Sequence, residues 1–142
     1  MTNSRWRLLL PLAYMATLLM LSSVPGRGEE SPASAILEWL APSWQNLLHI
    51  PLYGGLAASW LWALATLPLG RTARLAATLL LTLCWAAVDE LYQSSVPGRY
   101  GSATDLALNA VGAGLVVLWA RWRQGAAAPA TRPDPADDRD PA

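Results

Sequence analysis

Four long segments of the chain are almost free of charged residues, and they constrain the fold more than any other feature. They cover residues 8–24, 47–69, 75–88 (continuing to 92) and 106–120. An α-helix rises about 1.5 Å per residue, so each segment is roughly long enough for a bilayer core of about 30 Å. A soluble four-helix bundle would have a polar face on every helix, and only the third segment has even a partial one. The sequence therefore predicts an all-α polytopic membrane protein, a bundle of four transmembrane helices.

The composition divides the chain into two parts. Of its 142 residues, 54% are hydrophobic and 14% are charged, which is more apolar than a typical soluble domain. Residues 124–142 are instead rich in Ala, Pro and Asp and have no periodicity, so they offer too little apolar surface to fold. We therefore expect a transmembrane domain over residues 1–123 and a disordered cytoplasmic tail over residues 124–142.

The arginines predict the orientation in the membrane. The chain has no lysine, and arginines precede the first segment, fill the second loop and follow the fourth segment: Arg5, Arg7, Arg71, Arg74, Arg121 and Arg123. The positive-inside rule places these clusters in the cytoplasm. Both termini are then cytoplasmic, and the first and third loops lie outside.

The N-terminal segment has a second interpretation. Arginines followed by an apolar stretch also form the start of a secretory signal. No Ala-x-Ala cleavage site follows the apolar stretch, so an uncleaved first helix is the favoured interpretation.

Charged and amide side chains concentrate at the junction of the third and fourth segments. Asp89, Glu90, Arg99, Asp105 and Asn109 fall within residues 89–109. The 14 uncharged residues 75–88 span about 21 Å of helix, which holds Asp89 below the outer boundary of the hydrocarbon core. By the same argument, Asp105 also lies below the outer boundary of the hydrocarbon core. A charge inside the bilayer costs a few kcal/mol, so these side chains should face protein or water.

Helical spacing predicts which residues share this outer level. Thr78, Thr82, Trp85, Asp89 and Gln93 form one stripe, and Glu90 lies about 100° away from Asp89, so at most one of this pair points to the centre of the stripe. Asp105, Asn109 and Gly112 share a face of the last helix, and His49 opens the second helix one turn before Tyr53. The predicted polar pocket comprises His49, Tyr53, Asp89, Glu90, Gln93, Arg99, Asp105 and Asn109.

Four uses of this pocket are open from the residues alone. Arg99 could pair with Asp89, Glu90 or Asp105 and make the group purely structural. His49 could act as a base beside a carboxylate acid, although no clear nucleophile accompanies it. The pocket could also hold a divalent cation, or relay ions or protons.

Several function classes are disfavoured by missing motifs. The chain has no phosphate-binding Gly-rich loop, no cysteine cluster and no basic patch interleaved with aromatic residues, so we expect no nucleic acid partner and no cofactor. No HxxxH or HExxH spacing is present, so no metal is expected either.

The hexapeptide SSVPGR occurs twice, at residues 22–27 and 94–99. In each copy, Pro-Gly suits the central positions of a type II turn, because Pro presets φ and Gly accepts a positive φ. Two interpretations are open: a parallel repeat of two helix pairs, or two unrelated exits from the membrane that need the same turn.

The sequence over residues 89–114 resembles the signature of the VanZ-like family: Asp-Glu, then Gln, Val-Pro-Gly-Arg, and Asp, Asn and Gly on the last helix. Residues 47–57 are similar to the family's His and Tyr motif, but Asn46 stands where members often carry a lysine. The resemblance extends over nearly all of residues 8–122, and its motif falls on the eight residues of the predicted pocket.

The resemblance implies a multi-pass protein of the bacterial inner (plasma) membrane, in a family linked to resistance to glycopeptide antibiotics, teicoplanin especially. The expected partners are the lipid bilayer and an amphiphilic or lipid-linked ligand of the cell envelope, held in an outward-facing pocket. Two alternatives are a membrane enzyme acting on a lipid-linked envelope component and a scaffold without catalysis. The ligand and the oligomeric state are open.

Overall fold

A computed structural model describes residues 4–24 and 46–126, and every regular element in that part of the chain is helical. The elements are η1 (Ser4–Leu8), α1 (Leu9–Ser22), α4 (His49–Leu64), α5 (Arg71–Gln93) and α6 (Ala103–Ala126). The prediction of an all-α chain with four helices is thereby confirmed for the described residues. Helix α6 continues to Ala126, and the rest of the predicted tail lies outside them.

Two of the four α-helices meet the length and hydropathy of a membrane span. Arg71–Gln93 and Ala103–Arg123 have mean hydropathies of 1.4 and 1.5, whereas Trp6–Ser22 is a shorter apolar helix. Helix α4 has 16 residues, about 24 Å of rise. The predicted segment 47–69 was longer, but turn hydrogen bonds from Thr66 and Leu67 end the helix before Pro68.

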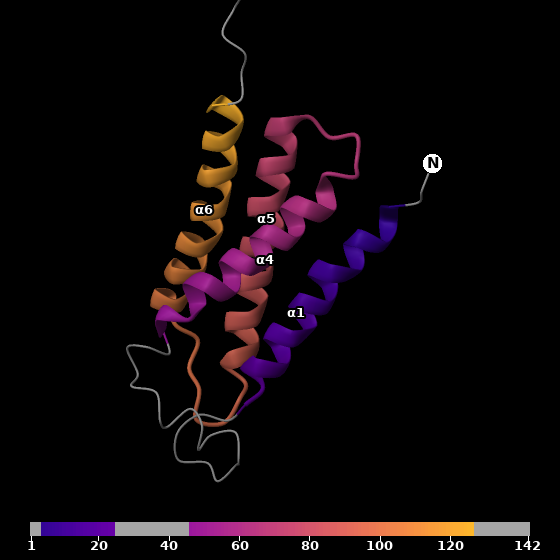
Figure 1. Ribbon diagram of the computed structural model, residues 1–142. Coiled ribbons are helices and arrows are strands. Elements are labelled where there is room, and N and C mark those ends of the chain that lie inside the picture. The colour runs from indigo at the N-terminus through magenta and orange to yellow at the C-terminus, as the bar shows by residue number, and fades with distance from the viewer. Residues whose placement is uncertain (1–3, 25–45, 127–142) are drawn as a thin grey trace, which may run out of the picture.

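Helix α4 occupies the centre of the bundle. It crosses α6 and α5, and α1 packs against its other side (Figure 1). Its inward face is fully buried at Leu56, Ala57 and Ala63. With 16 residues, α4 is shorter than the roughly 20 residues of a typical span, and its place among other helices keeps much of it away from lipid.

A glycine contact sets the crossing of α4 and α6. A Cβ atom added at Gly112 would overlap the carbonyl oxygen of Ile50, and one added at Gly54 would lie 3.5 Å from the carbonyl oxygen of Gly112. Gly54 and Gly112 are therefore packing glycines of this crossing. Because the backbones touch here, the start of α4 is held against the first turns of α6.

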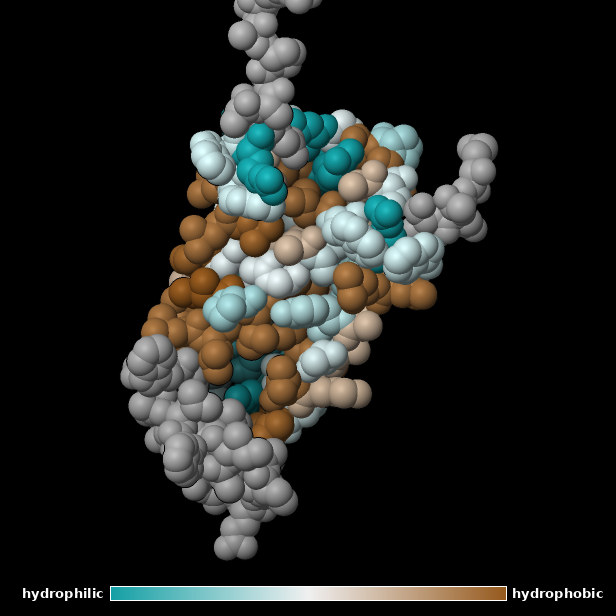
Figure 2. Space-filling view, viewed as in Figure 1, coloured by the Kyte–Doolittle hydropathy of each residue, from teal (hydrophilic) through white to brown (hydrophobic). Residues whose placement is uncertain are grey.

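The outer surface of the bundle is strongly apolar. Large hydrophobic side chains project from α1, α5 and α6, including Met20 (73% exposed), Leu80 (64%), Leu91 (75%) and Leu118 (63%). Figure 2 shows apolar residues over much of the visible face, with hydrophilic groups gathered at one end and in a recess near the other. Soluble proteins rarely expose so much contiguous apolar surface, whereas lipid requires it.

Arginines gather at the end of the bundle where α5 begins and α6 ends. Arg71 donates a 2.7 Å hydrogen bond to the carbonyl oxygen of Arg121. The guanidinium of Arg7 lies 4.6 Å from the ring centroid of Trp62, and that of Arg123 lies 4.9 Å from the ring of Trp119. Basic and indole side chains of this kind are typical of a membrane interface.

The second SSVPGR copy forms the predicted turn. The amide of Arg99 donates a 3.1 Å hydrogen bond to the carbonyl oxygen of Val96, and Gly98 has a φ of 71°. This is the geometry of a type II turn with Pro97 and Gly98 at its centre. In the first copy only residues 22–24 are described.

Candidate functional site

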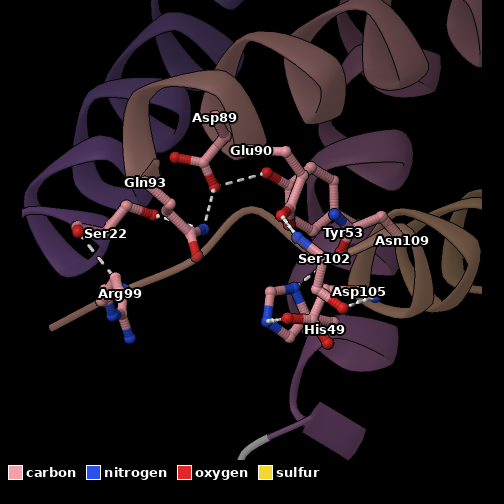
Figure 3. A network of polar contacts seen from close by, with 10 residues as sticks. All are labelled: Ser22, His49, Tyr53, Asp89, Glu90, Gln93, Arg99, Ser102, Asp105 and Asn109. Carbon is pink, nitrogen blue, oxygen red and sulfur yellow. Dashed lines mark hydrogen bonds and ion pairs between the residues drawn. The ribbon is translucent and has the colours of Figure 1, made fainter. Parts of the chain in front are cut away.

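A polar cluster lies at the end of the bundle opposite the arginines. There the beginnings of α4 and α6 meet the last turn of α5, beside the end of α1 (Figure 3). We use "polar cluster" for His49, Tyr53, Asp89, Glu90, Gln93, Asp105 and Asn109. The cluster is enclosed: Tyr53, Asp89 and Asn109 are at most 2% exposed.

Asp89 is the most connected carboxylate of the cluster. Its Oδ2 accepts a 2.7 Å hydrogen bond from the Tyr53 hydroxyl and a 3.3 Å bond from Gln93 Nε2. The predicted stripe places it there: Thr78, Thr82 and Gln93 on the same face of α5 are also buried. Asp89 therefore ties α5 to α4.

Glu90 is also buried, with 7% exposure, although it lies on a different face of α5. Its Oε2 accepts a 2.9 Å hydrogen bond from the amide of Ser102. The Ser102 hydroxyl in turn accepts a 3.3 Å bond from the amide of Asp105, which caps the N-terminus of α6. Helical spacing predicted a central place for only one of the two carboxylates, but the loop before α6 covers Glu90 and buries both.

His49 connects α4 to α6. Its Nδ1 lies 2.9 Å from Asn109 Oδ1, and its Nε2 lies 3.9 Å from Asp105 Oδ2. An amide oxygen only accepts hydrogen bonds, so Nδ1 is the protonated nitrogen in this arrangement. The ring stacks against Tyr53, with 10° between the planes. Nε2 is consequently the ring nitrogen that faces a carboxylate.

Arg99 does not pair with a carboxylate, so the predicted pairing with Asp89, Glu90 or Asp105 is wrong for this structure. Its Nη1 donates a 3.2 Å hydrogen bond to the carbonyl oxygen of Ser22, at the C-terminal end of α1. Carbonyl groups at a helix C-terminus lack partners within the helix and carry partial negative charge, which explains the attraction. Arg99 therefore anchors α1 at the edge of the cluster.

Two serines that the sequence did not predict also contribute to the site. Ser22 is 5% exposed, and its hydroxyl accepts a 3.2 Å hydrogen bond from Gln93 Nε2. Ser102 joins Glu90 to α6. The repeat was a usable signal for Ser22, since the first SSVPGR copy begins there and touches Arg99 of the second copy.

Each carboxylate of the cluster keeps one buried oxygen without a hydrogen-bond partner among the described residues. These atoms are Asp89 Oδ1, Glu90 Oε1 and Asp105 Oδ1, and Asn109 Nδ2 is unpartnered as well. The other unpartnered buried side-chain atoms in the described ranges lie on Arg7, Trp60, Arg74, Thr78 and Trp85, so every such carboxylate oxygen belongs to the cluster. Buried polar atoms are normally satisfied, and exceptions call for an explanation.

The carboxylates are not arranged around a common metal position. Within residues 4–24 and 46–126, no group of three or more His, Cys, Asp and Glu side chains could hold a metal ion. Divalent cations in proteins usually require such a set of converging ligands.

The structure brings together seven of the eight predicted pocket residues and places Arg99 at their edge (Figure 3). Their role in binding or chemistry stays a prediction.

Comparison with known families gives a match to the VanZ/LLP1 family over residues 8–124, most of the chain. The chain belongs to the VanZ/LLP1 family. The match takes in α1, α4, α5 and nearly all of α6, together with the whole polar cluster, which confirms the resemblance inferred from residues 89–114. Neither the curated proteins nor the solved structures gave a match. Family membership and the two apolar helices together indicate a VanZ-like membrane protein.

Proposed function

We propose that this VanZ-family protein spans the bacterial inner membrane four times, with both termini in the cytoplasm, and binds an amphiphilic or lipid-linked envelope component in its polar cluster. The cluster would face the outer side of the membrane. Protection against glycopeptides of the teicoplanin type, to which the family is linked, would follow if the bound component takes part in their action.

One observation carries the binding proposal. Four buried polar atoms, on Asp89, Glu90, Asp105 and Asn109, have no hydrogen-bond partner among the described residues. A cluster that only locked helices together would gain stability by satisfying these atoms, because each buried orphan costs about 1–3 kcal/mol. A ligand that satisfies them recovers this cost on binding.

The proposed orientation rests on the two ends of the bundle. The arginines of α5 and α6 lie at one end, and the polar cluster lies at the other. Positive charge favours the cytoplasmic side, which directs the cluster outward. Helix α4 completes the four spans in this proposal because neighbouring helices shield much of this short, 16-residue helix from lipid.

A second candidate function is an enzyme acting on a lipid-linked envelope component. Its support is His49, whose Nδ1 is fixed by Asn109 while Nε2 faces Asp105. A ring held in one tautomer with the other nitrogen available is the arrangement of a general acid or base.

The two functions are separated by His49→Ala and Asp89→Asn in the full-length protein reconstituted in nanodiscs made from native membrane lipids. Lipids that copurify and lipids that are chemically changed are both measured by mass spectrometry. If the protein binds without turnover, both variants should retain less of one lipid class than the wild type does. The wild type should then form no new lipid product. Accumulation of a product that both variants abolish, with retention unchanged, would replace the binding proposal with the enzyme. Retention that is identical in all three proteins would exclude both.

A further inference from the structure

The polar cluster has an excess of negative groups. It contains three carboxylates, and the one basic side chain within ion-pair distance of any of them in the described residues is His49, 3.9 Å from Asp105. Arg99, the nearest candidate counter-charge in the sequence, is bound to the carbonyl oxygen of Ser22 instead. Burying a carboxylate without a compensating charge is costly, so the cluster favours a positively charged occupant.

Asn109 supplies an independent indication. Its side chain is 0% exposed, and its Oδ1 is taken by His49, while Nδ2 has no partner among the described residues. An amide N–H needs an acceptor. A simple cation would satisfy the carboxylates but not this donor, so the occupant should also carry an acceptor atom close to its positive group.

We infer that the polar cluster takes the head of an amphiphile in which a primary ammonium group lies a few bonds from an oxygen acceptor, as in an ethanolamine phosphoester. This inference rests on the proposed binding function and adds the chemistry of the ligand. An ammonium N–H donates to an unpartnered carboxylate oxygen of the cluster, and the nearby oxygen of the head accepts from Asn109 Nδ2.

Competing head groups fit the same atoms less well. A quaternary ammonium has no N–H to donate to a carboxylate oxygen. A purely anionic head would meet like charges at Asp89, Glu90 and Asp105. A divalent metal lacks a converging ligand set within the described residues.

The test is competition among lipids with identical acyl chains. The full-length protein in detergent is mixed with equal amounts of phosphatidylethanolamine, phosphatidylcholine and phosphatidylglycerol, and retained lipids are counted by native mass spectrometry. We expect phosphatidylethanolamine to be retained about tenfold more than phosphatidylcholine, the effect of one charge-assisted hydrogen bond or more. Equal retention of the two by the wild type overturns the inference without needing any variant.

Variants show whether the preference belongs to the cluster. Asp105→Asn removes one unpartnered oxygen and its charge, and Thr104→Asn places the same amide on the neighbouring exposed position. The preference should fall severalfold in Asp105→Asn and persist in Thr104→Asn. If Asp105→Asn lowers retention of all three lipids equally, the binding function stands and the ammonium inference fails. If Asp105→Asn changes the retention of none of the three lipids, the binding function and the ammonium inference both fail.

Free head groups identify the source of the ligand. O-phosphoethanolamine should displace the retained lipid, whereas phosphocholine should not, and displacement by both overturns the inference. Tighter binding of the lipid than of O-phosphoethanolamine assigns the site to a membrane lipid. Equal binding assigns it to a soluble amino alcohol with the same head.

Discussion

Tyr53 donates a 2.7 Å hydrogen bond to Asp89 across the interface of α4 and α5, and both side chains are almost fully buried. The bond places a hydroxyl dipole against a carboxylate where no water competes, a setting in which charge-assisted hydrogen bonds are strongest. It therefore fixes the central helix α4 against the buried carboxylate of α5.

Removing this hydroxyl should destabilise the protein. Tyr53→Phe keeps the ring and takes the donor from Asp89, at an expected cost of about 1–3 kcal/mol in the free energy of unfolding. Unfolding in mixed micelles measures it. Tyr100→Phe is the matched control, because Tyr100 is 88% exposed and should be neutral. Equal changes in the free energy of unfolding for the two substitutions would contradict a stabilising hydrogen bond from the Tyr53 hydroxyl.

Two glycines of α6 should respond oppositely to alanine. In Gly112→Ala the new Cβ overlaps the carbonyl oxygen of Ile50, so α4 and α6 must separate, at a cost of about 1–3 kcal/mol. Gly114→Ala meets nothing within 4 Å and should be neutral or stabilise by up to about 1 kcal/mol through helix propensity. Melting temperatures of the two variants in one detergent compare them. A Gly112→Ala variant as stable as Gly114→Ala would contradict the close crossing.

Arg99 should behave as an anchor of α1 and not as the partner of a carboxylate. Arg99→Gln loses a hydrogen bond to the Ser22 carbonyl and is expected to cost about 0.5–1.5 kcal/mol, less than the roughly 3–5 kcal/mol of breaking a buried ion pair. A double-mutant cycle with Asp105→Asn should be additive within about 0.5 kcal/mol. A larger coupling energy would mean that Arg99 and Asp105 form a pair after all.

The two ends of the bundle should react on opposite sides of the membrane. In a Cys84→Ala background, Ser95→Cys near the polar cluster should react with an impermeant maleimide in intact cells. Thr72→Cys at the start of α5 should react only after permeabilisation; both positions are exposed. Helix–loop boundaries and the arginines predict this outcome. The reverse pattern would direct the cluster toward the cytoplasm.

Local periodicity and turn chemistry accounted for much of the site. The i, i+4 and i+11 spacing identified the buried stripe through Thr78, Thr82 and Asp89, and Pro97-Gly98 gave the turn. These features depend only on residues near one another in the chain.

The contacts that local patterns could not specify join distant segments. Pairing of Arg99 with a carboxylate was one of the open possibilities, but a helix end 77 residues away supplies its acceptor. Helical spacing allowed at most one of Asp89 and Glu90 at the centre of the stripe, whereas Glu90 is also buried and bonds to the amide of Ser102. Helix α4 was expected to span the membrane on composition, and with 16 residues it is shorter than the two helices that meet the length of a span.

The most direct test is a high-resolution structure of the full-length protein in nanodiscs containing phosphatidylethanolamine. We expect density for a lipid head within about 3 Å of at least one unpartnered carboxylate oxygen of the cluster, the hydrogen-bond distance of a charged donor. The acyl chains should leave the cluster toward the apolar surface. Carboxylates paired with one another, with Arg99 or with ordered water alone, and no lipid head between His49 and Asp89, would contradict the proposal that the cluster is a binding site.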